Sequence, residues 1–382
     1  MGRSSQINVS VFLCFNVYNY TCVFELVKKN LQINCRFSPN QVYNVLYTFP
    51  KVIVMTILII LILLVLLTIG GSWYAYSRAF YSPKSKRVSS DAPLIGEQYA
   101  TVADNIHRIS SIMQRFPFES VKINAEDGTV LFGRYYHFRN NAPIEILFHG
   151  YRSHPYRDCS GGHALARKMG FNVLVVDQRA HGSSGCNSIT FGIKERLDCF
   201  SWIQYLNHRF GEDTPIILSG LSMGAATVLM TADLNLPQNV RCIIADSPYS
   251  SPLDIILKVS KDEGFPPAVC APFLHLGARL FGRFQLGNCT AKDAVRNAKV
   301  PILLIHGEDD HFVPCEMSIE IAANCASRVE VATFPSAGHG LSYLTDPVRY
   351  EKVVCRFLCS IPVLNHAIDP DYICNLYENY PE

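Results

Sequence analysis

Short apolar runs alternate with helical patterns along the chain from residue 144 onward. A run without a polar face fits a strand that is buried on both sides, and helices between such runs connect parallel strands. The alternation therefore predicts a mostly parallel central sheet with helices on both faces. The runs are IEILF, NVLVVD, PIILSG, RCIIAD, PILLIH and VEVATF, and the helical patterns lie near residues 160–169, 192–210, 223–234, 316–326 and 346–359.

The residues just before this region predict a helix and a β-hairpin. In ATVADNIHRISSIMQRF four apolar side chains recur at helical spacing, which predicts one buried face made of Ile106, Ile109, Ile112 and Met113. The stretches SVKINAEDG and TVLFGRYYHF then meet at an Asp-Gly pair, which favours a tight turn between two strands.

A polar cluster directly follows each of the six predicted strands. In open α/β sheets ligands bind beyond the carboxyl ends of the strands, and these ends meet at one edge. Serine, aspartate and histidine occur among the clusters in that chain order, so we expect the active site at this edge. The clusters are HGYRSH (149–154), DQRAHGSSG (177–185), the serine turn near 222, DSPYSS (246–251), HGEDDHFVP (306–314) and PSAGHG (335–340).

The stretch ILSGLSMGAA, residues 217–226, has two interpretations. Serine is a favoured N-cap residue, so Ser222 could simply begin a helix. It also matches G-x-S-x-G, the nucleophile elbow, in which a strained strand-to-helix turn exposes the serine hydroxyl. Gly220 and Gly224 would then give room to a bend that a Cβ would crowd.

Residues 117–360 resemble the α/β-hydrolase family. The resemblance is carried by H-G after the third strand, D-x-R-x-H-G-x-S at 177–183, G-L-S-M-G at 220–224, H-G-x-x-D-x-x-V-P at 306–314 and G-H-G at 338–340. With its N-terminal apolar helix, the chain is more narrowly similar to membrane-anchored bacterial serine hydrolases that have a serine-aminopeptidase-like domain. Ala180 departs from the glycine usual in the family, in a loop that is structural there.

The resemblance implies a catalytic triad of Ser222 as nucleophile, Asp310 as acid and His339 as base. Serine needs such a base to take its proton during attack. Asp309 and Asp246 remain alternatives for the acid.

The tetrahedral oxyanion would be met by the backbone N–H groups of Tyr151 and Met223. His149, His306 and Asp177 are expected to orient loops rather than to take part in the reaction.

Residues 247–292 form an insertion between the sixth and seventh strands, rich in proline, phenylalanine and leucine. In this fold such an insertion makes a cap over the active site. An apolar cap suggests a substrate with an acyl chain or an aromatic acid. Ordinary packing of the cap explains the composition equally well.

Residues 52–69, VIVMTILIILILLVLLTI, contain no charge and are long enough to span a bilayer as a helix. Interfacial aromatics follow at once, which favours an uncleaved single-pass anchor (residues 51–71) over a cleaved signal peptide. Basic residues after the segment outnumber those before it, so the catalytic domain is expected on the cytoplasmic side. A chain starting near Ser89 is expected to be soluble and fully active.

The remaining regions complete the predicted organisation. Residues 1–50 are unassigned, 72–116 read as a linker and a helix, and 361–382 as a tail. A formal net charge of +2 gives no sign of a nucleic-acid partner, and 14 cysteines without a C-x-x-C pair argue against a zinc site.

We expect a serine hydrolase that cleaves carboxylic esters through an acyl-enzyme, without metal or organic cofactor. A serine peptidase acting on short peptides is the alternative, and a non-catalytic membrane-tethered binding module is a third reading.

Overall fold

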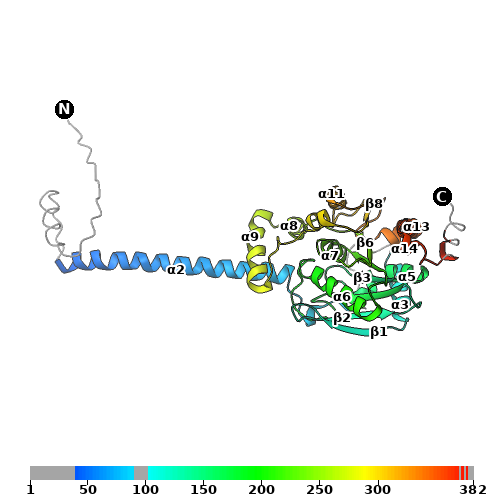
Figure 1. Ribbon diagram of the computed structural model, residues 1–382. Coiled ribbons are helices and arrows are strands. Elements are labelled where there is room, and N and C mark those ends of the chain that lie inside the picture. Colours follow the sequence, from blue (N-terminus) through cyan, green and yellow to red (C-terminus); the bar gives the residue numbers. More distant parts are fainter. Residues whose placement is uncertain (1–38, 90–101, 370, 374–375, 377–382) are drawn as a thin grey trace, which may run out of the picture. The chain divides into compact units, whose positions relative to one another are not determined.

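The computed structural model describes residues 39–89, 102–369, 371–373 and 376, with side chains from residue 51 onward (Figure 1). Residues 1–38 of the unassigned segment lie outside the described residues, as do residues 370, 374–375 and 377–382 of the tail expected at 361–382. The chain divides into two compact parts, one up to Leu66 and one from Leu67 onward.

Helix α2 runs from Pro39 to Ala79 and contains the whole apolar run. Among the described residues, one helix segment, Lys51–Ala79, is long and apolar enough to cross a membrane by length and composition. Every residue from 52 to 69 is exposed.

An eight-stranded sheet forms the centre of the second part, in the order β1-β2-β4-β3-β5-β6-β7-β8. The hairpin partners β1 and β2 are antiparallel, β2 is antiparallel to β4, and every other pair is parallel. This is the mostly parallel sheet that the apolar runs predict. The strands are β1 Glu119–Asn124, β2 Val130–Tyr136, β3 Ile144–Phe148, β4 Asn172–Asp177, β5 Ile216–Leu221, β6 Val240–Asp246, β7 Ile302–Gly307 and β8 Val329–Phe334.

Helices cover both faces of the sheet because the buried strands present apolar side chains to each side. One face packs against α6 (Glu195–Phe210), α7 (Met223–Thr231), α10 (Ala291–Ala294) and α11 (Glu316–Asn324). The other packs against α3 (Ala103–Gln114), α5 (Ser160–Lys168), α13 (Pro347–Cys359) and α14 (Pro362–Asn365). The short helices α4 (Pro155–Asp158) and α12 (Ser342–Thr345) lie in loops.

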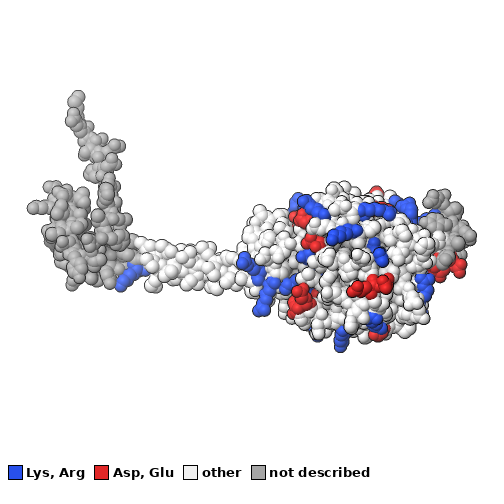
Figure 2. Space-filling model, in the orientation of Figure 1, with Lys and Arg blue, Asp and Glu red and all other residues white. Residues whose placement is uncertain are grey.

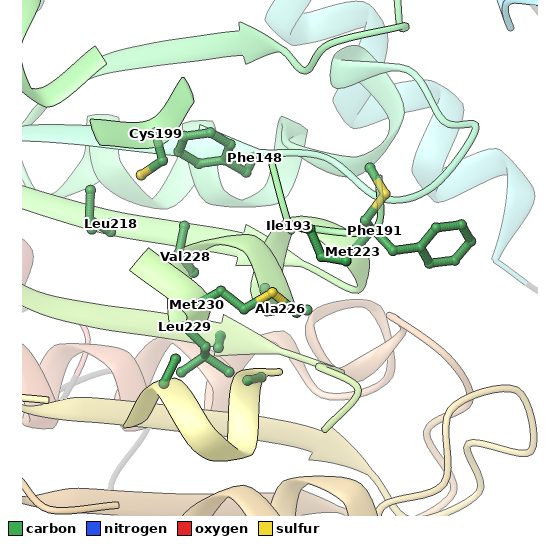
Figure 3. Packing of buried hydrophobic residues seen from close by; sticks show 14 of the residues in the cluster. Phe148, Phe191, Ile193, Cys199, Leu218, Met223, Ala226, Val228, Leu229 and Met230 are labelled. Carbon is green, nitrogen blue, oxygen red and sulfur yellow. The ribbon is translucent and has the colours of Figure 1, made fainter. Parts of the chain in front are cut away.

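Helix α7 is buried over its whole length. Figure 3 shows its side chains Val228 and Leu229 among the packed residues that include Phe148 and Leu218 of the neighbouring strands. A helix that is apolar all round must lie inside the protein, and this one fixes the position of the turn before it.

In helix α3 the predicted buried face of four apolar residues is only partly buried. Ile106 and Met113 are buried as expected, and Ile109 is half-buried, but the side chain of Ile112 is 40% exposed. Ile112 lies at the margin of the apolar stripe that the helix presents to the sheet. This buried stripe is narrower than the four-residue pattern implied.

The insertion after β6 folds into α8 (Pro252–Asp262), α9 (Pro267–Gly277) and a π-helical turn (Ala278–Gly282). Ile255, Ile256 and Leu274 are buried against the main core. Phe265 and Val269 are exposed although they are apolar. The cap therefore uses part of its apolar surface for packing and leaves part of it open.

The end of helix α2 is part of the main core rather than a linker. Phe80 is fully buried and Tyr76 nearly so, and the Tyr76 hydroxyl lies 2.6 Å from Ser188 Oγ. Arg87 then donates to the carbonyl oxygens of Gly182 and Ser184. Tyr76 directly follows the apolar run and was interpreted as interfacial, and residues 72–116 were expected to be a linker and a helix. Because Tyr76, Phe80 and Arg87 contact the core, a chain starting at Ser89 would lose these contacts.

Candidate active site

The turn between β5 and α7 holds Ser222 in a conformation that few residues adopt. Its φ of 55° and ψ of −115° lie outside the regions that side-chain-bearing residues usually occupy. A Cβ on Gly220 would lie 2.3 Å from the backbone of Gly224, and one on Gly224 would lie 2.1 Å from the Phe148 carbonyl oxygen. Both glycines are thus required by the close backbone approach, as the elbow interpretation expects.

Ser222, His339 and Asp310 form one chain of hydrogen bonds. Ser222 Oγ lies 2.9 Å from His339 Nε2, and His339 Nδ1 lies 2.7 Å from Asp310 Oδ2. Because the carboxylate can only accept, Nδ1 carries the proton and Nε2 accepts from the serine hydroxyl. The three loops after β5, β7 and β8 thus bring together the residues that the sequence selected.

Asp310 is buried, and its surroundings favour the ionised form. Burial would raise the pKa of this carboxyl, but hydrogen bonds from His306 and His339, with the Val313 amide, hold the pKa well below its usual range. Its neighbour Asp309 is exposed.

The other alternative, Asp246, is buried at the end of β6. Burial raises its pKa to about 6, and its Oδ1 accepts from the Ser247 hydroxyl. The geometry therefore selects Asp310 as the partner of His339.

The two backbone amides expected to hold the oxyanion have no hydrogen-bond acceptor among the described residues. In the described part of the chain, neither the Tyr151 nor the Met223 N–H donates to another protein group. Met223 begins α7, whose first N–H groups have no intrahelical partner. The Tyr151 side chain points elsewhere, since its hydroxyl donates to the Ala79 carbonyl oxygen at 2.7 Å.

The loop after β3 is held by His149, which was expected to orient loops, and by Asp158, which was not predicted from the sequence. The Gly150 amide donates to Asp158 Oδ2 at 2.8 Å. His149, which is fully buried, accepts from the Gln178 amide and donates to the Gly150 carbonyl oxygen. Burial lowers the pKa of His149, so its imidazole stays neutral. Asp158 could not be found from sequence, because it belongs to a short helix that follows the HGYRSH cluster.

His306 and Asp177, which were expected to orient loops, are both fully buried. The Nε2–H of His306 is shared between the Val313 carbonyl oxygen at 2.8 Å and Asp310 Oδ2 at 3.3 Å, and Nδ1 accepts from Ser318. Asp177 forms a buried ion pair with Arg134 at 2.7 Å. Ser247 is a further loop anchor that sequence analysis missed, since it accepts from the Gly340 amide beside His339.

Two cavities meet at Ser222. One, of about 440 Å³, lies between the end of α2 and the cap helices α8 and α9. The other, of about 360 Å³, extends on the side of α3, α5 and α12 and reaches the buried carboxyl of Glu145. Both volumes fall in the range of small-molecule sites. Among the described residues, no group of three His, Cys, Asp or Glu side chains could hold a metal ion.

This fold and this hydrogen-bonded site define an α/β hydrolase, and the chain belongs to the alpha/beta hydrolase family, whose profile matches residues 146–353. It is 24% identical over 191 residues to the uncharacterized protein YqkD of Bacillus subtilis, covering 50% of this chain and 63% of that protein. It is 25% identical over 193 residues to protein bem46 of Schizosaccharomyces pombe, covering 50% and 58%. The match spans less than two thirds of the length of either relative.

The fold has a counterpart among solved structures. The esterase Pf2001 of Pyrococcus furiosus aligns with a TM-score of 0.54 and 24% identity, over 71% of this chain and 95% of that one. At this level of identity the likeness concerns the fold.

Proposed function

We propose that this protein is a serine hydrolase of carboxylic esters that works through an acyl-enzyme. The observation that carries the proposal is the hydrogen-bonded chain from Ser222 through His339 to Asp310. A serine on a strained turn, an imidazole hydrogen-bonded to it and a buried carboxylate behind the imidazole are the parts that nucleophilic acyl transfer needs.

The reaction follows from these positions. His339 Nε2 takes the hydroxyl proton as Ser222 Oγ bonds to the ester carbonyl carbon, and the carbonyl electron pair moves to oxygen. The amides of Tyr151 and Met223 stabilise that oxyanion. As the C–O bond to the alcohol breaks, the imidazolium returns the proton to the leaving oxygen. Water, deprotonated by His339, then cleaves the acyl-enzyme by the same steps.

Ester cleavage is favoured over peptide cleavage by the charges of the cap. A peptidase releasing short peptides needs a free carboxylate for the substrate amine. The three candidates in the cap each have a basic partner: Glu263 with Arg78 at 3.6 Å, Asp262 with Lys258 at 2.7 Å and Asp254 with Lys292 at 3.7 Å.

The location is part of the proposal. We infer that the apolar helix anchors the protein in a membrane as a single span, with the catalytic domain on the cytoplasmic side. Its exposed apolar side chains support the anchor, because so large an apolar surface is stable in lipid and costly in water. The excess of basic residues after the span supports the orientation.

Labelling with a fluorophosphonate probe tests the proposed function. We expect the full chain to be labelled and to hydrolyse p-nitrophenyl acetate, and we expect Ser222→Ala to lose both. Ser201→Ala, which removes a half-buried hydroxyl from α6, is the control and should retain both. Labelling that survives in Ser222→Ala would place the nucleophile elsewhere. Faster cleavage of dipeptides than of any ester would favour the peptidase.

A further inference from the structure

We infer that the last two turns of helix α2 form one wall of an acyl-chain site, so that the substrate is an amphiphilic ester with one long acyl chain. This inference rests on the proposed function and names its substrate class. Its basis is the cavity of about 440 Å³ that begins at Ser222, because residues of α2 line it together with the cap.

The cavity is apolar along most of its length. From the α2 side it is bordered by Gly71, Tyr74 and Ala75, and from the cap by Ile256, Val269 and Phe273. Helix α9 carries no Lys, Arg, Asp or Glu, and the cap around α9 is largely free of charged side chains on the face seen in Figure 2. Such a lining offers an alkyl chain contacts but few hydrogen bonds, which favours long acyl groups over polar acids.

Small residues bring α2 and α9 close together. A Cβ on Gly277 would lie 2.5 Å from the Ser72 carbonyl oxygen, and a Cβ on Gly71 would lie 2.8 Å from the Phe273 ring. The two helices therefore touch at Gly277, and the Phe273 ring packs against the α2 backbone at Gly71. The wall is a built feature of the catalytic domain, since both contacts belong to the part of the chain from Leu67 onward.

Polar groups occur at the rim of the cavity. Arg78 and Glu263 form an exposed ion pair at 3.6 Å, and Arg152 donates to the Arg78 carbonyl oxygen at 2.8 Å. The cavity thus combines an apolar interior with a charged rim, which matches a substrate that has an alkyl chain and a polar headgroup.

The chain itself connects this cavity to the proposed membrane span. Gly71 is two residues after Ile69, the last residue of the apolar run, on the same helix. At about 1.5 Å per helical residue, the wall begins within one turn of the lipid-facing segment.

A matched pair of adjacent glycines tests the inference. Gly70 has open space around it, whereas the Phe273 ring lies against Gly71, so a side chain at residue 71 would have to displace this cavity-lining ring. We would compare Gly70→Leu and Gly71→Leu in the full chain, held in nanodiscs of ether-linked phosphatidylcholine, which contains no ester. The substrates are p-nitrophenyl esters from acetate to decanoate.

In the parent chain, kcat/KM should rise by up to about fourfold per methylene until the cavity is full. Gly71→Leu should reduce kcat/KM for decanoate at least tenfold more than for acetate, and Gly70→Leu should follow the parent. Equal losses at every chain length in Gly71→Leu, or no loss, would overturn the inference. Phe273→Ala, which enlarges the cavity, should move the best chain length upward, and an unchanged optimum would count against it.

Binding without turnover separates this inference from the proposed reaction. In the Ser222→Ala chain, a fluorescent dodecanoic acid analogue should bind, and Gly71→Leu but not Gly70→Leu should weaken its affinity at least tenfold. If the probe behaves so while no ester is hydrolysed by the parent, the acyl site stands and the proposed reaction fails. If esters are hydrolysed without chain-length preference and the probe does not bind, the reaction stands and the acyl site fails.

Discussion

Ser222 Oγ lies 2.9 Å from His339 Nε2, although 117 residues of chain separate the two. The contact exists because β5 and β8 end at the same edge of the sheet and because the serine turn cannot relax. Its positive φ and the two crowded glycines around it fix the direction of the hydroxyl. The backbone conformation of the turn therefore determines where the Ser222 hydroxyl lies.

Replacing Ser222 with alanine removes the group that we propose to attack the ester. Ester turnover should fall by a factor on the order of 10⁴ to 10⁶, the size of triad losses in serine hydrolases. The fold should persist, because the serine Oγ bonds mainly to His339 and the elbow is held by its glycines. The measurement is steady-state ester hydrolysis by the parent and the variant, with circular dichroism as a control for folding. Residual activity above about a tenth of the parent would contradict the assignment.

Three aspartate variants test the acid. Asp310→Asn should reduce turnover by about 10³ to 10⁴, because an amide favours the wrong tautomer of His339. The exposed neighbour variant Asp309→Asn should stay close to the parent, and Asp246→Asn should cost far less than Asp310→Asn. Values of kcat for the three chains are the measurement. A larger loss at Asp246 would assign the acid to β6.

Much of this site could be predicted from the sequence because its signals are local. The glycines around Ser222 report a turn that only small residues permit, and each candidate follows a strand whose apolar run is short and unambiguous. The sequence offered a weaker basis for choosing Asp310 rather than Asp309 as the acid, since two adjacent carboxylates differ in burial and not in sequence pattern. Burial depends on how the loop after β7 packs, which the structure alone provides.

The residues that the sequence did not reveal act through contacts between distant elements. Asp158 holds Gly150 through a turn of chain with no motif of its own. Tyr76 and Phe80 follow a membrane-like segment, so their aromatic rings look interfacial until the cap and the core are seen to surround them. The contact between Gly71 and the Phe273 ring could not be predicted for the same reason, because a glycine does not indicate which distant side chain packs against it.

Glu145 should make the stability of the fold depend on pH. It is fully buried on β3, where burial raises its pKa to about 7 against 4.5 when exposed, and Ser219 donates to it. Between these values the native state binds the proton more tightly than the unfolded state. The stabilisation is therefore complete below about pH 4.5 and is lost as the pH rises through about 7.

The Glu145→Gln chain isolates this effect, since the amide keeps the oxygen that accepts from Ser219 and cannot ionise. Relative to this variant, the parent should lose up to about 3 kcal/mol of unfolding free energy between pH 5 and pH 8. Denaturant unfolding of both chains at the two pH values measures the difference. A parent-to-variant difference that does not change with pH would refute the prediction.

Adding a single carbon at Gly224 should destabilise the fold. The Cβ in Gly224→Ala would lie 2.1 Å from the Phe148 carbonyl oxygen, so β3 and α7 would have to separate. Overpacking of this kind costs about 1–3 kcal/mol and more where backbone atoms clash. Gly287→Ala is the matched control, because nothing lies within 4 Å of its Cβ. Thermal unfolding should show a clear drop in Tm for the first chain alone.

The final prediction concerns where the catalytic domain begins. A chain starting at Leu67 keeps Tyr76 and Phe80, whereas a chain starting at Ser89 loses both from the core and also Arg87, which binds the loop after β4. Losing a buried aromatic ring costs about 3–5 kcal/mol, and the shorter chain loses the whole segment that carries two of them. We expect the chain from Leu67 to fold and to cleave p-nitrophenyl acetate, and the chain from Ser89 to be unstable or aggregated. Phe80→Ala in the full chain provides an intermediate case and should lower Tm without abolishing labelling of Ser222. Equal stability of the two shortened chains would show that residues 67–88 only rest on the domain, and the boundary would return to the one expected from sequence.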